Sequence, residues 1–313
     1  MPKKICSILF ILAVLLCRTN LQEAVAMEKF SVMLDWYPNI DHVPIYAALG
    51  KGFFKEAGLD VRILSPSDTS DAMKLAATAK VDIAVTYEPQ VIIAYASDIP
   101  VKVTGRLVGH PLSTLLFLKG KGIREPKDLN GKKLGYTVPG MMDVLLDAFA
   151  SINGIDSYET VNVGFSIIPS LTSGKVDAIM GPYKNYEAVE MEMKGYEPGF
   201  FEIEKMGIPD YDELIFVSGK NNYAKRKNAI DAFGEAIGKA IAFTKNHPDD
   251  ALDMYFSAVP DADKEMEREA FKRTISLYAE NQVLDMNKWQ TFADFAFKHG
   301  LIDHTVSVKG LFQ

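Results

Sequence analysis

The stretch Leu59-Asp-Val-Arg-Ile-Leu64, followed by residues 69–78 and then by Val81-Asp-Ile-Ala-Val-Thr86, decides the fold. The first segment alternates apolar and polar residues, and the last is short and rich in β-branched residues, so both are predicted strands. Between them the apolar residues have helical spacing, with Asp68 as the predicted N-cap. Strands and helices alternating at this length predict a parallel or mixed sheet with helices on both faces.

The same alternation continues on both sides of this stretch and then starts a second time. The first series has predicted strands at 30–35, 59–64, 81–86 and 101–107 and helices at 44–49, 69–78 and 89–96. The second has strands at 113–118, 132–136, 161–165, 176–180 and 214–218 and helices at 141–153, 167–173 and 182–194. Residues 224–299 then form a tail of four predicted amphipathic helices, broken near Pro248, Pro260 and Asp285.

Two such series in 313 residues predict an α/β fold of two lobes, because this length exceeds what one hydrophobic core usually supports. Lobe one would hold residues 27–112 plus 219–313, and lobe two would hold 113–218. The strands near Ser113 and Leu214 would be two crossovers forming a hinge. Ligands of α/β proteins bind beyond the carboxyl ends of the strands and in clefts between domains, so the segments just after each strand are the candidate site.

The first 26 residues have the pattern of a secretory signal peptide. Two lysines precede a short apolar run, and the segment ends in Ala24-Val25-Ala26. The alternative is an interfacial or buried helix. A lipid anchor at Cys17 is not expected, because Leu16 stands where lipoprotein processing requires a small residue. Cleavage after Ala26 would leave a periplasmic chain that we expect to be monomeric.

Charge and cysteine content exclude several classes of function. The net charge of −7, without basic clusters, argues against nucleic acid and anionic membranes as partners. Both cysteines, Cys6 and Cys17, lie in the predicted signal peptide, so the exported chain would have no disulfide, thiol nucleophile or cysteine metal site. The scattered histidines form no HExxH motif, and there is no GxSxG or GxGxxG. We therefore predict no catalytic residue, metal or cofactor.

The loop after the first strand is the strongest candidate for ligand binding. It places Asp35, Trp36, Asn39 and His42 within eight residues, together with Tyr37. An aromatic floor flanked by directional hydrogen-bonding groups suits a flat heterocycle. The alternative is an ordinary loop whose aromatic residues cover the core.

Three further segments follow strands and supply the remaining candidates, which are Tyr87, Glu88, Met141, Tyr183, Asn185 and Glu187. Tyr183, Asn185 and Glu187 could form a second wall opposite Trp36. Each segment also has a purely structural interpretation. Glu88 could complement a helix dipole, and the segments that contain Met141 and Tyr183 could be ordinary helix starts.

These segments resemble the binding proteins for thiamine pyrimidine precursors. The resemblance lies in Asp35-Trp36-Tyr37-Pro38-Asn39 with His42, and in the segments 51–61, 87–89, 128–135 and 181–187. It covers nearly the whole chain after residue 26. The segment 51–61 is shared by type II periplasmic-binding relatives in general, whereas the loop with Trp36 and His42 is more specific.

The resemblance implies a periplasmic-binding-protein type II fold and the receptor of an ABC importer. The implied ligand is a small nitrogen heterocycle such as a formylaminopyrimidine, and the implied partner is a permease in the inner membrane. Relatives include enzymes that build hydroxymethylpyrimidine phosphate with a cysteine-rich iron motif, which residues 27–313 lack. Other relatives bind riboflavin or other aromatic compounds.

The chain departs from the family pattern at two places. Val43-Pro44 stands where members tend to have Thr-Gly, and Lys184 stands where they often have Trp. These differences predict a pocket of different shape. The hypotheses are therefore a receptor for an aminopyrimidine or another aromatic compound, a pyrimidine-precursor synthase, and a sensor ectodomain.

Overall fold

The computed structural model describes residues 27–312, so the predicted signal peptide and Cys17 lie outside the described residues. The first sheet has the order β2-β1-β3-β10-β4, and β10 is its antiparallel member. Its strands are β1 (Glu28–Met33), β2 (Leu59–Leu64), β3 (Ile83–Thr86), β4 (Val101–Val108) and β10 (Leu214–Gly219). The predicted α/β arrangement, with parallel strands around residues 59–86, is confirmed.

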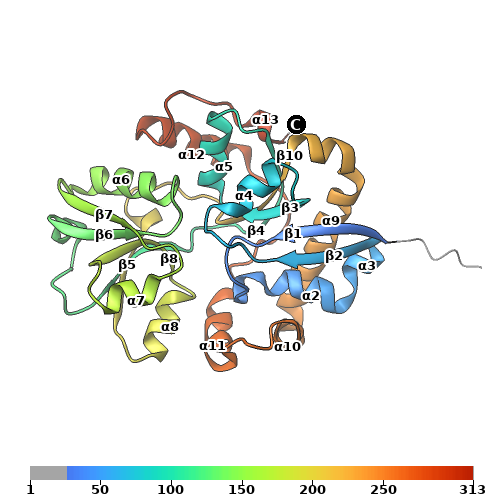
Figure 1. Cartoon of the computed structure of the whole chain (residues 1–313), viewed down its shortest axis with the longest axis horizontal. Coiled ribbons are helices and arrows are strands. Elements are labelled where there is room, and N and C mark those ends of the chain that lie inside the picture. The colour runs from blue at the N-terminus through green and yellow to red at the C-terminus, as the bar shows by residue number, and fades with distance from the viewer. Residues whose placement is uncertain (1–26, 313) are drawn as a thin grey trace, which may run out of the picture.

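The second sheet has the same plan and lies beside the first (Figure 1). Its order is β7-β6-β8-β5-β9, with β5 antiparallel to both of its neighbours. The strands are β5 (Ser113–Leu118), β6 (Lys132–Tyr136), β7 (Tyr158–Asn162), β8 (Ala178–Tyr183) and β9 (Pro198–Glu202). Strand β9 was not predicted.

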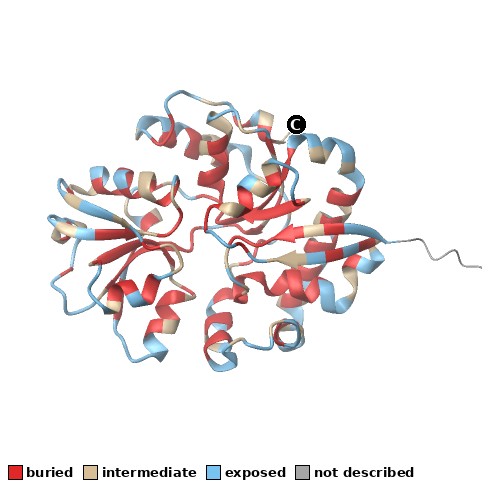
Figure 2. Ribbon diagram, in the orientation of Figure 1, coloured by how far each residue is buried: buried red, intermediate tan, exposed pale blue. Residues whose placement is uncertain are grey.

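Helices cover both sheets, and Figure 2 shows the buried strands between their inward faces. The first lobe has α2 (Val43–Lys51), α3 (Phe53–Glu56), α4 (Asp71–Ala77) and α5 (Glu88–Ala96); the second has α6 (Met142–Asn153), α7 (Ile167–Thr172) and α8 (Glu187–Met193). The short 3-10 turns are η1 (Ile40–His42), η2 (Pro126–Leu129) and η3 (Ile203–Lys205). Helix α6 ends at Gly154, whose φ of 69° closes the helix as the sequence predicts.

The tail contains the four predicted helices and packs on the first lobe. They are α9 (Lys220–Asn246), α10 (Pro248–Ala258), α11 (Lys264–Thr274) and α12 (Met286–Lys298), followed by α13 (Lys309–Phe312). Phe233 of α9 is surrounded by the rings of Phe30, Phe54 and Phe216, each with a centroid distance of 5.3 Å. This aromatic contact attaches the long helix to the first sheet, so the tail and residues 28–108 share one core.

Several predicted boundaries were wrong for identifiable reasons. Strand β7 begins three residues before Val161, because an edge strand tolerates polar residues such as Glu159. Strand β8 continues to Tyr183 through its pairing with Ser113, so α8 begins at Glu187 rather than at residue 182.

The predicted cap and the lobe boundary also differ from the structure. Asp68 does not cap α4; its carboxylate accepts the backbone N–H of Ser70 at 2.9 Å, and Ser70 occupies the N-cap position. Strand β10 belongs to the first sheet, so the chain returns to it before Leu214 rather than at residue 219.

Two crossovers, residues 109–112 and 206–213, connect the sheets and are tied together by Glu213. Its carboxylate accepts the backbone N–H groups of Leu112 and Ser113 at 2.6 and 2.9 Å. The hydroxyls of Ser113 and Tyr211 donate to it at 3.0 and 3.1 Å. Both crossovers therefore share one buried acceptor.

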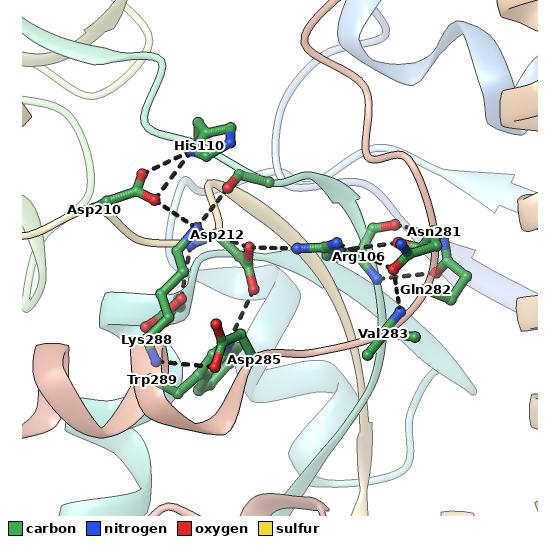
Figure 3. Close-up of polar contacts among 12 residues, drawn as sticks. Arg106, His110, Asp210, Asp212, Asn281, Gln282, Val283, Asp285, Lys288 and Trp289 are labelled. Atoms are coloured by element: carbon green, nitrogen blue, oxygen red, sulfur yellow. Dashed lines mark hydrogen bonds and ion pairs between the residues drawn. The ribbon is translucent and has the colours of Figure 1, made fainter.

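A second carboxylate, Asp212, attaches the return crossover to α12 (Figure 3). Trp289 Nε1 donates to Asp212 Oδ2 at 2.9 Å, and Lys288 Nζ lies 3.2 Å from Oδ1. Lys288 also donates to the carbonyl of Gly109 in the other crossover at 2.6 Å. The exposed pair His110 and Asp210, 3.0 Å apart, adds a further link between the crossovers.

Candidate functional site

A small cavity lies between the two lobes, at the carboxyl ends of their central strands. Its lining residues from the first lobe follow β1 and β3: Asp35, Trp36, Asn39 and Tyr87. Those from the second lobe belong to or follow β6, β7 and β8: Thr137, Val138, Met142, Ile167, Gly181, Tyr183 and Glu187. This is the position expected for a ligand of an α/β protein.

The first wall is organised around Asp35. Oδ1 of Asp35 lies 2.9 Å from His42 Nε2, and Oδ2 accepts the hydroxyl of Tyr87 at 2.9 Å. The backbone N–H of Asn39 donates to His42 Nδ1 at 3.3 Å, so Nδ1 carries no proton and Nε2–H donates to Asp35. His42 is fully buried behind this carboxylate and orients it.

The second wall is organised around Glu187. Its Oε2 accepts the backbone N–H of Tyr183 at 2.7 Å, where β8 ends and α8 begins. Burial raises the pKa of Glu187 to about 7, against the stabilising effect of that backbone hydrogen bond on the charged form. The carboxyl therefore changes its protonation state near neutral pH. The hydroxyl of Tyr183 points to Glu213 at 3.4 Å, which connects this wall to the hinge.

Trp36 lies between the cavity and a wider outer groove, and its side chain lines both. Its ring packs edge-on against Phe165 of the second lobe, with centroids 4.5 Å apart, and Tyr37 contacts the same ring at 4.4 Å. All three aromatic residues line the outer groove, and of the three only Trp36 also lines the cavity. Trp36 is only partly exposed, whereas Tyr37 is 51% exposed.

The electrostatics of the cavity favour a ligand that donates hydrogen bonds or carries positive charge. Asp35 and Glu187 line it, and none of its lining residues is a lysine or an arginine. Such a lining disfavours sulfonates and phosphates, which proteins bind with arginine, lysine or free N–H groups.

The lobes are closed over this cavity. Thr69 Oγ1 of the first lobe donates to the carbonyl of Thr137 at 2.9 Å. On the opposite side Asn185 donates to Asp41 at 2.8 Å, and Tyr186 donates to Glu267 of α11 at 3.0 Å. These hydrogen bonds must break when the cleft opens.

Six of the ten predicted site residues line the cavity: Asp35, Trp36, Asn39, Tyr87, Tyr183 and Glu187. His42 acts through Asp35, as described above. The structure does not place the other three, Glu88, Met141 and Asn185, in the lining.

Each of these three departures has a local reason. Glu88 turns toward the hinge, where its Oε2 accepts the backbone N–H of Asp212 at 2.7 Å. Met141 is buried in the core, and its neighbour Met142 lines the cavity instead. Asn185 reaches Asp41 and Thr274, outside the cavity.

Sequence reasoning missed Thr137, Val138, Met142, Ile167 and Gly181 as lining residues. The first three lie between strand β6 and the start of α6, in the same segment as the predicted Met141, so position after a strand was a usable signal. Gly181 has a φ of 114°, and a Cβ there would lie 2.2 Å from Thr137 Oγ1, so only glycine fits. Ile167 carried no signal in the sequence.

Two kinds of feature are absent from residues 27–312. Within that range no group of three or more His, Cys, Asp or Glu side chains is placed to hold a metal ion. No helix in the same range is long and apolar enough to cross a membrane.

Comparison with protein families gives a match to the NMT1/THI5 like family over residues 39–251. The chain belongs to this family. It is 38% identical over 288 residues to a Haemophilus influenzae protein named as a thiamine biosynthesis protein, covering 91% of each chain. It is 30% identical over 323 residues to the formylaminopyrimidine-binding protein of Halalkalibacterium halodurans, covering 99% of this chain and 98% of the relative.

Enzymes occur among the more distant relatives. The 4-amino-5-hydroxymethyl-2-methylpyrimidine phosphate synthase of Legionella pneumophila is 26% identical over 281 residues, covering 88% of each chain. Membership of the family alone therefore does not distinguish a binding protein from an enzyme.

Solved structures show that the fold is that of type II periplasmic binding proteins. The alkanesulfonate-binding protein SsuA of Xanthomonas axonopodis pv. citri superimposes with a TM-score of 0.73 at 12% identity, covering 91% of this chain and 98% of that one. The Candida albicans CA3427 gene product gives 0.71 at 16% identity, covering 91% and 95%. The predicted fold is confirmed.

Proposed function

We propose that this protein is an extracytoplasmic solute-binding protein of an ABC importer and that its ligand is an aminopyrimidine. The observation that carries the proposal is the cavity itself, which combines an aromatic floor at Trp36 with the carboxyl groups of Asp35 and Glu187 and no lysine or arginine. The name of the Halalkalibacterium halodurans relative, formylaminopyrimidine-binding protein, supports the same ligand class.

A 4-aminopyrimidine offers an exocyclic amine beside a ring nitrogen, and a carboxyl group matches this pair. One carboxyl oxygen accepts a hydrogen bond from the amine. The other oxygen shares one proton with the ring nitrogen: either the carboxyl O–H donates to the nitrogen, or the protonated nitrogen donates to the carboxylate. Glu187 suits this role because its pKa of about 7 allows the proton to lie on either partner near neutral pH. Trp36 and Tyr183, from opposite lobes, would contact the two faces of the ring.

The closed two-lobed architecture supports the proposed transport role. A ligand between the lobes contacts groups of both at once, so it favours the closed conformation over the open one. Export by the N-terminal segment and presentation of the closed form to an inner-membrane permease belong to the same proposal. The periplasmic binding proteins among the structural neighbours are consistent with it.

A synthase of the kind found in Legionella pneumophila is the second candidate function. The position of His42 weighs against a role for this residue in chemistry on a bound ring, because it is fully buried behind Asp35 and outside the cavity lining. A synthase would convert its substrate, whereas a receptor returns its ligand unchanged.

Titration calorimetry tests the proposal with three probes: formylaminopyrimidine, riboflavin and an alkanesulfonate. We expect one-to-one binding of the aminopyrimidine, little binding of the sulfonate and recovery of the unaltered ligand after long incubation. Glu187→Gln should weaken aminopyrimidine binding by about ten- to a hundredfold, because it removes a charge-assisted hydrogen bond. Preferred binding of riboflavin or the sulfonate, or conversion of the pyrimidine, would overturn the proposal.

A further inference from the structure

A second polar contact joins the lobes outside the ligand cavity. Asp41 lies in η1 of the first lobe, and Asn185 lies between β8 and α8 of the second. Asn185 Nδ2 donates to Asp41 Oδ1 and to Thr274 Oγ1, both at 2.8 Å. All three side chains are buried, and none of them lines the cavity.

The orientation of the Asn185 amide follows from Thr274. The hydroxyl of Thr274 donates to the carbonyl of Ala270 at 2.9 Å, so its oxygen can only accept a hydrogen bond from Asn185. Nδ2 must therefore face Thr274 and Asp41, and both of its protons are used. The amide oxygen Oδ1 is left to find a donor of its own.

Two buried oxygens at this contact have no hydrogen-bond partner among residues 27–312: Asp41 Oδ2 and Asn185 Oδ1. If Asp41 is ionised, both are acceptors and neither can satisfy the other. If Asp41 carries a proton on Oδ2, that oxygen becomes a donor. An acid and an amide can then form two reciprocal hydrogen bonds, which would satisfy both oxygens together.

The charges around Asp41 favour the protonated form. Asp35 faces it from its own loop, Glu187 from the second lobe and Glu267 from α11, while Tyr183, Tyr255 and Tyr278 are the other titratable neighbours. Both ring nitrogens of the neighbouring His42 already have partners, since Nε2 contacts Asp35 and Nδ1 accepts the backbone N–H of Asn39. Burial, with these three carboxyl groups, raises the pKa of Asp41 well above its ordinary value.

We propose that Asp41 and Asn185 form a proton-dependent latch, in which Asp41 is protonated in the closed protein and holds the lobes together by two reciprocal hydrogen bonds to the Asn185 amide. Opening withdraws Asn185 and exposes Asp41 to water, where a carboxyl ionises near pH 4. Closing therefore takes up a proton. The closed form is favoured as the pH falls and loses this contribution as the pH rises through the raised pKa, so an acidic medium strengthens ligand retention.

The latch goes beyond the proposed function and can be tested without any ligand. The Asp41→Asn variant replaces the protonated acid with a neutral amide that makes the same two hydrogen bonds at every pH. Small-angle scattering of the ligand-free protein should show the native chain becoming more compact between pH 8.5 and 6. The Asp41→Asn variant should change less over the same range, because only Glu187, Glu213 and Glu267 then titrate near the cleft and the hinge. Identical pH responses of the two proteins would overturn the latch.

A second arm uses calorimetry with formylaminopyrimidine in buffers of different ionisation enthalpy. At a pH at which scattering shows the ligand-free native protein to be open, it should take up more protons per binding event than Asp41→Asn, and equal uptake would contradict the proposal. Asn185→Leu should weaken binding at least about tenfold at pH 6 and less at pH 8.5. Thr69→Val, which removes the hydrogen bond from Thr69 to the carbonyl of Thr137, should weaken binding equally at both pH values. If this probe does not bind, the function proposed above fails, and the scattering result still decides on the latch.

Discussion

At the scale of single residues, the cavity is built from side chains whose neighbours fix them. Asp35 is held from two sides by His42 and Tyr87, and the backbone of Tyr183 fixes Glu187. Trp36 packs against Phe165 in a T-shaped contact and lines the cavity. Preorganisation of this kind lowers the entropic cost of binding a small ligand.

Replacing Trp36 by alanine tests the placement of the site. Trp36→Ala removes the aromatic floor and should cost about 2 kcal/mol of binding free energy, which is roughly a thirtyfold rise in Kd. Tyr37→Ala is the matched control, since Tyr37 is 51% exposed and lines only the outer groove; we expect a change below about threefold. Unaltered aminopyrimidine affinity in Trp36→Ala, measured by calorimetry, would show that the ligand binds elsewhere.

At the scale of elements, the site depends on where strands end and helices begin. The segments after β1, β3, β6 and β8 could be named as site segments from the sequence, because the carboxyl ends of the strands define the ligand-facing edge. The residue within each segment was harder to predict. Tyr87 and Met142 line the cavity while the adjacent Glu88 and Met141 do not, and a shift of one residue depends on turn geometry that periodicity does not specify.

Gly181, in β8 at the edge of the cavity, should tolerate no side chain. Gly181→Ala combines a φ of 114° with a Cβ only 2.2 Å from Thr137 Oγ1, so it should lower the free energy of unfolding by about 3 kcal/mol. Gly174→Ala is the control, because its φ of 73° is also positive but nothing lies within 4 Å of the added Cβ, and about 1 kcal/mol is expected. Equal losses in urea unfolding would refute the steric explanation.

At the scale of the whole molecule, two similar sheets meet at a cleft rich in buried carboxyl groups. The two-lobed α/β plan and the helical tail were predictable because the alternation of strands and helices repeats along the chain. The contacts that close the lobes could not be predicted from the sequence. Asn185 was expected to face the ligand, and nothing in the sequence pairs it with Asp41, 144 positions away. Long-range pairing of this kind depends on the relative position of the lobes.

The buried carboxyl groups predict how stability depends on pH. Burial raises the pKa values of Glu187, Glu213 and Glu267 to about 7, from 4.5. Between these values the folded protein binds more protons than the unfolded chain, so the free energy of unfolding should fall as the pH rises from 5 to 8. Urea titrations at several pH values measure this slope.

Glu267→Gln provides the control for that slope, because it removes one of the three titrating groups while keeping an acceptor for Tyr186 and Tyr255. The slope should become shallower in this variant. A stability that rises between pH 5 and 8, or an identical slope in Glu267→Gln, would contradict the attribution to these carboxyl groups.

The central claim is that the closed cleft retains an aminopyrimidine without changing it. Mass spectrometry of the small molecule released on denaturing the purified protein tests this claim most directly. We predict one equivalent of an unmodified aminopyrimidine, lost in Trp36→Ala. Release of a flavin, a sulfonate or a phosphorylated pyrimidine product would contradict it.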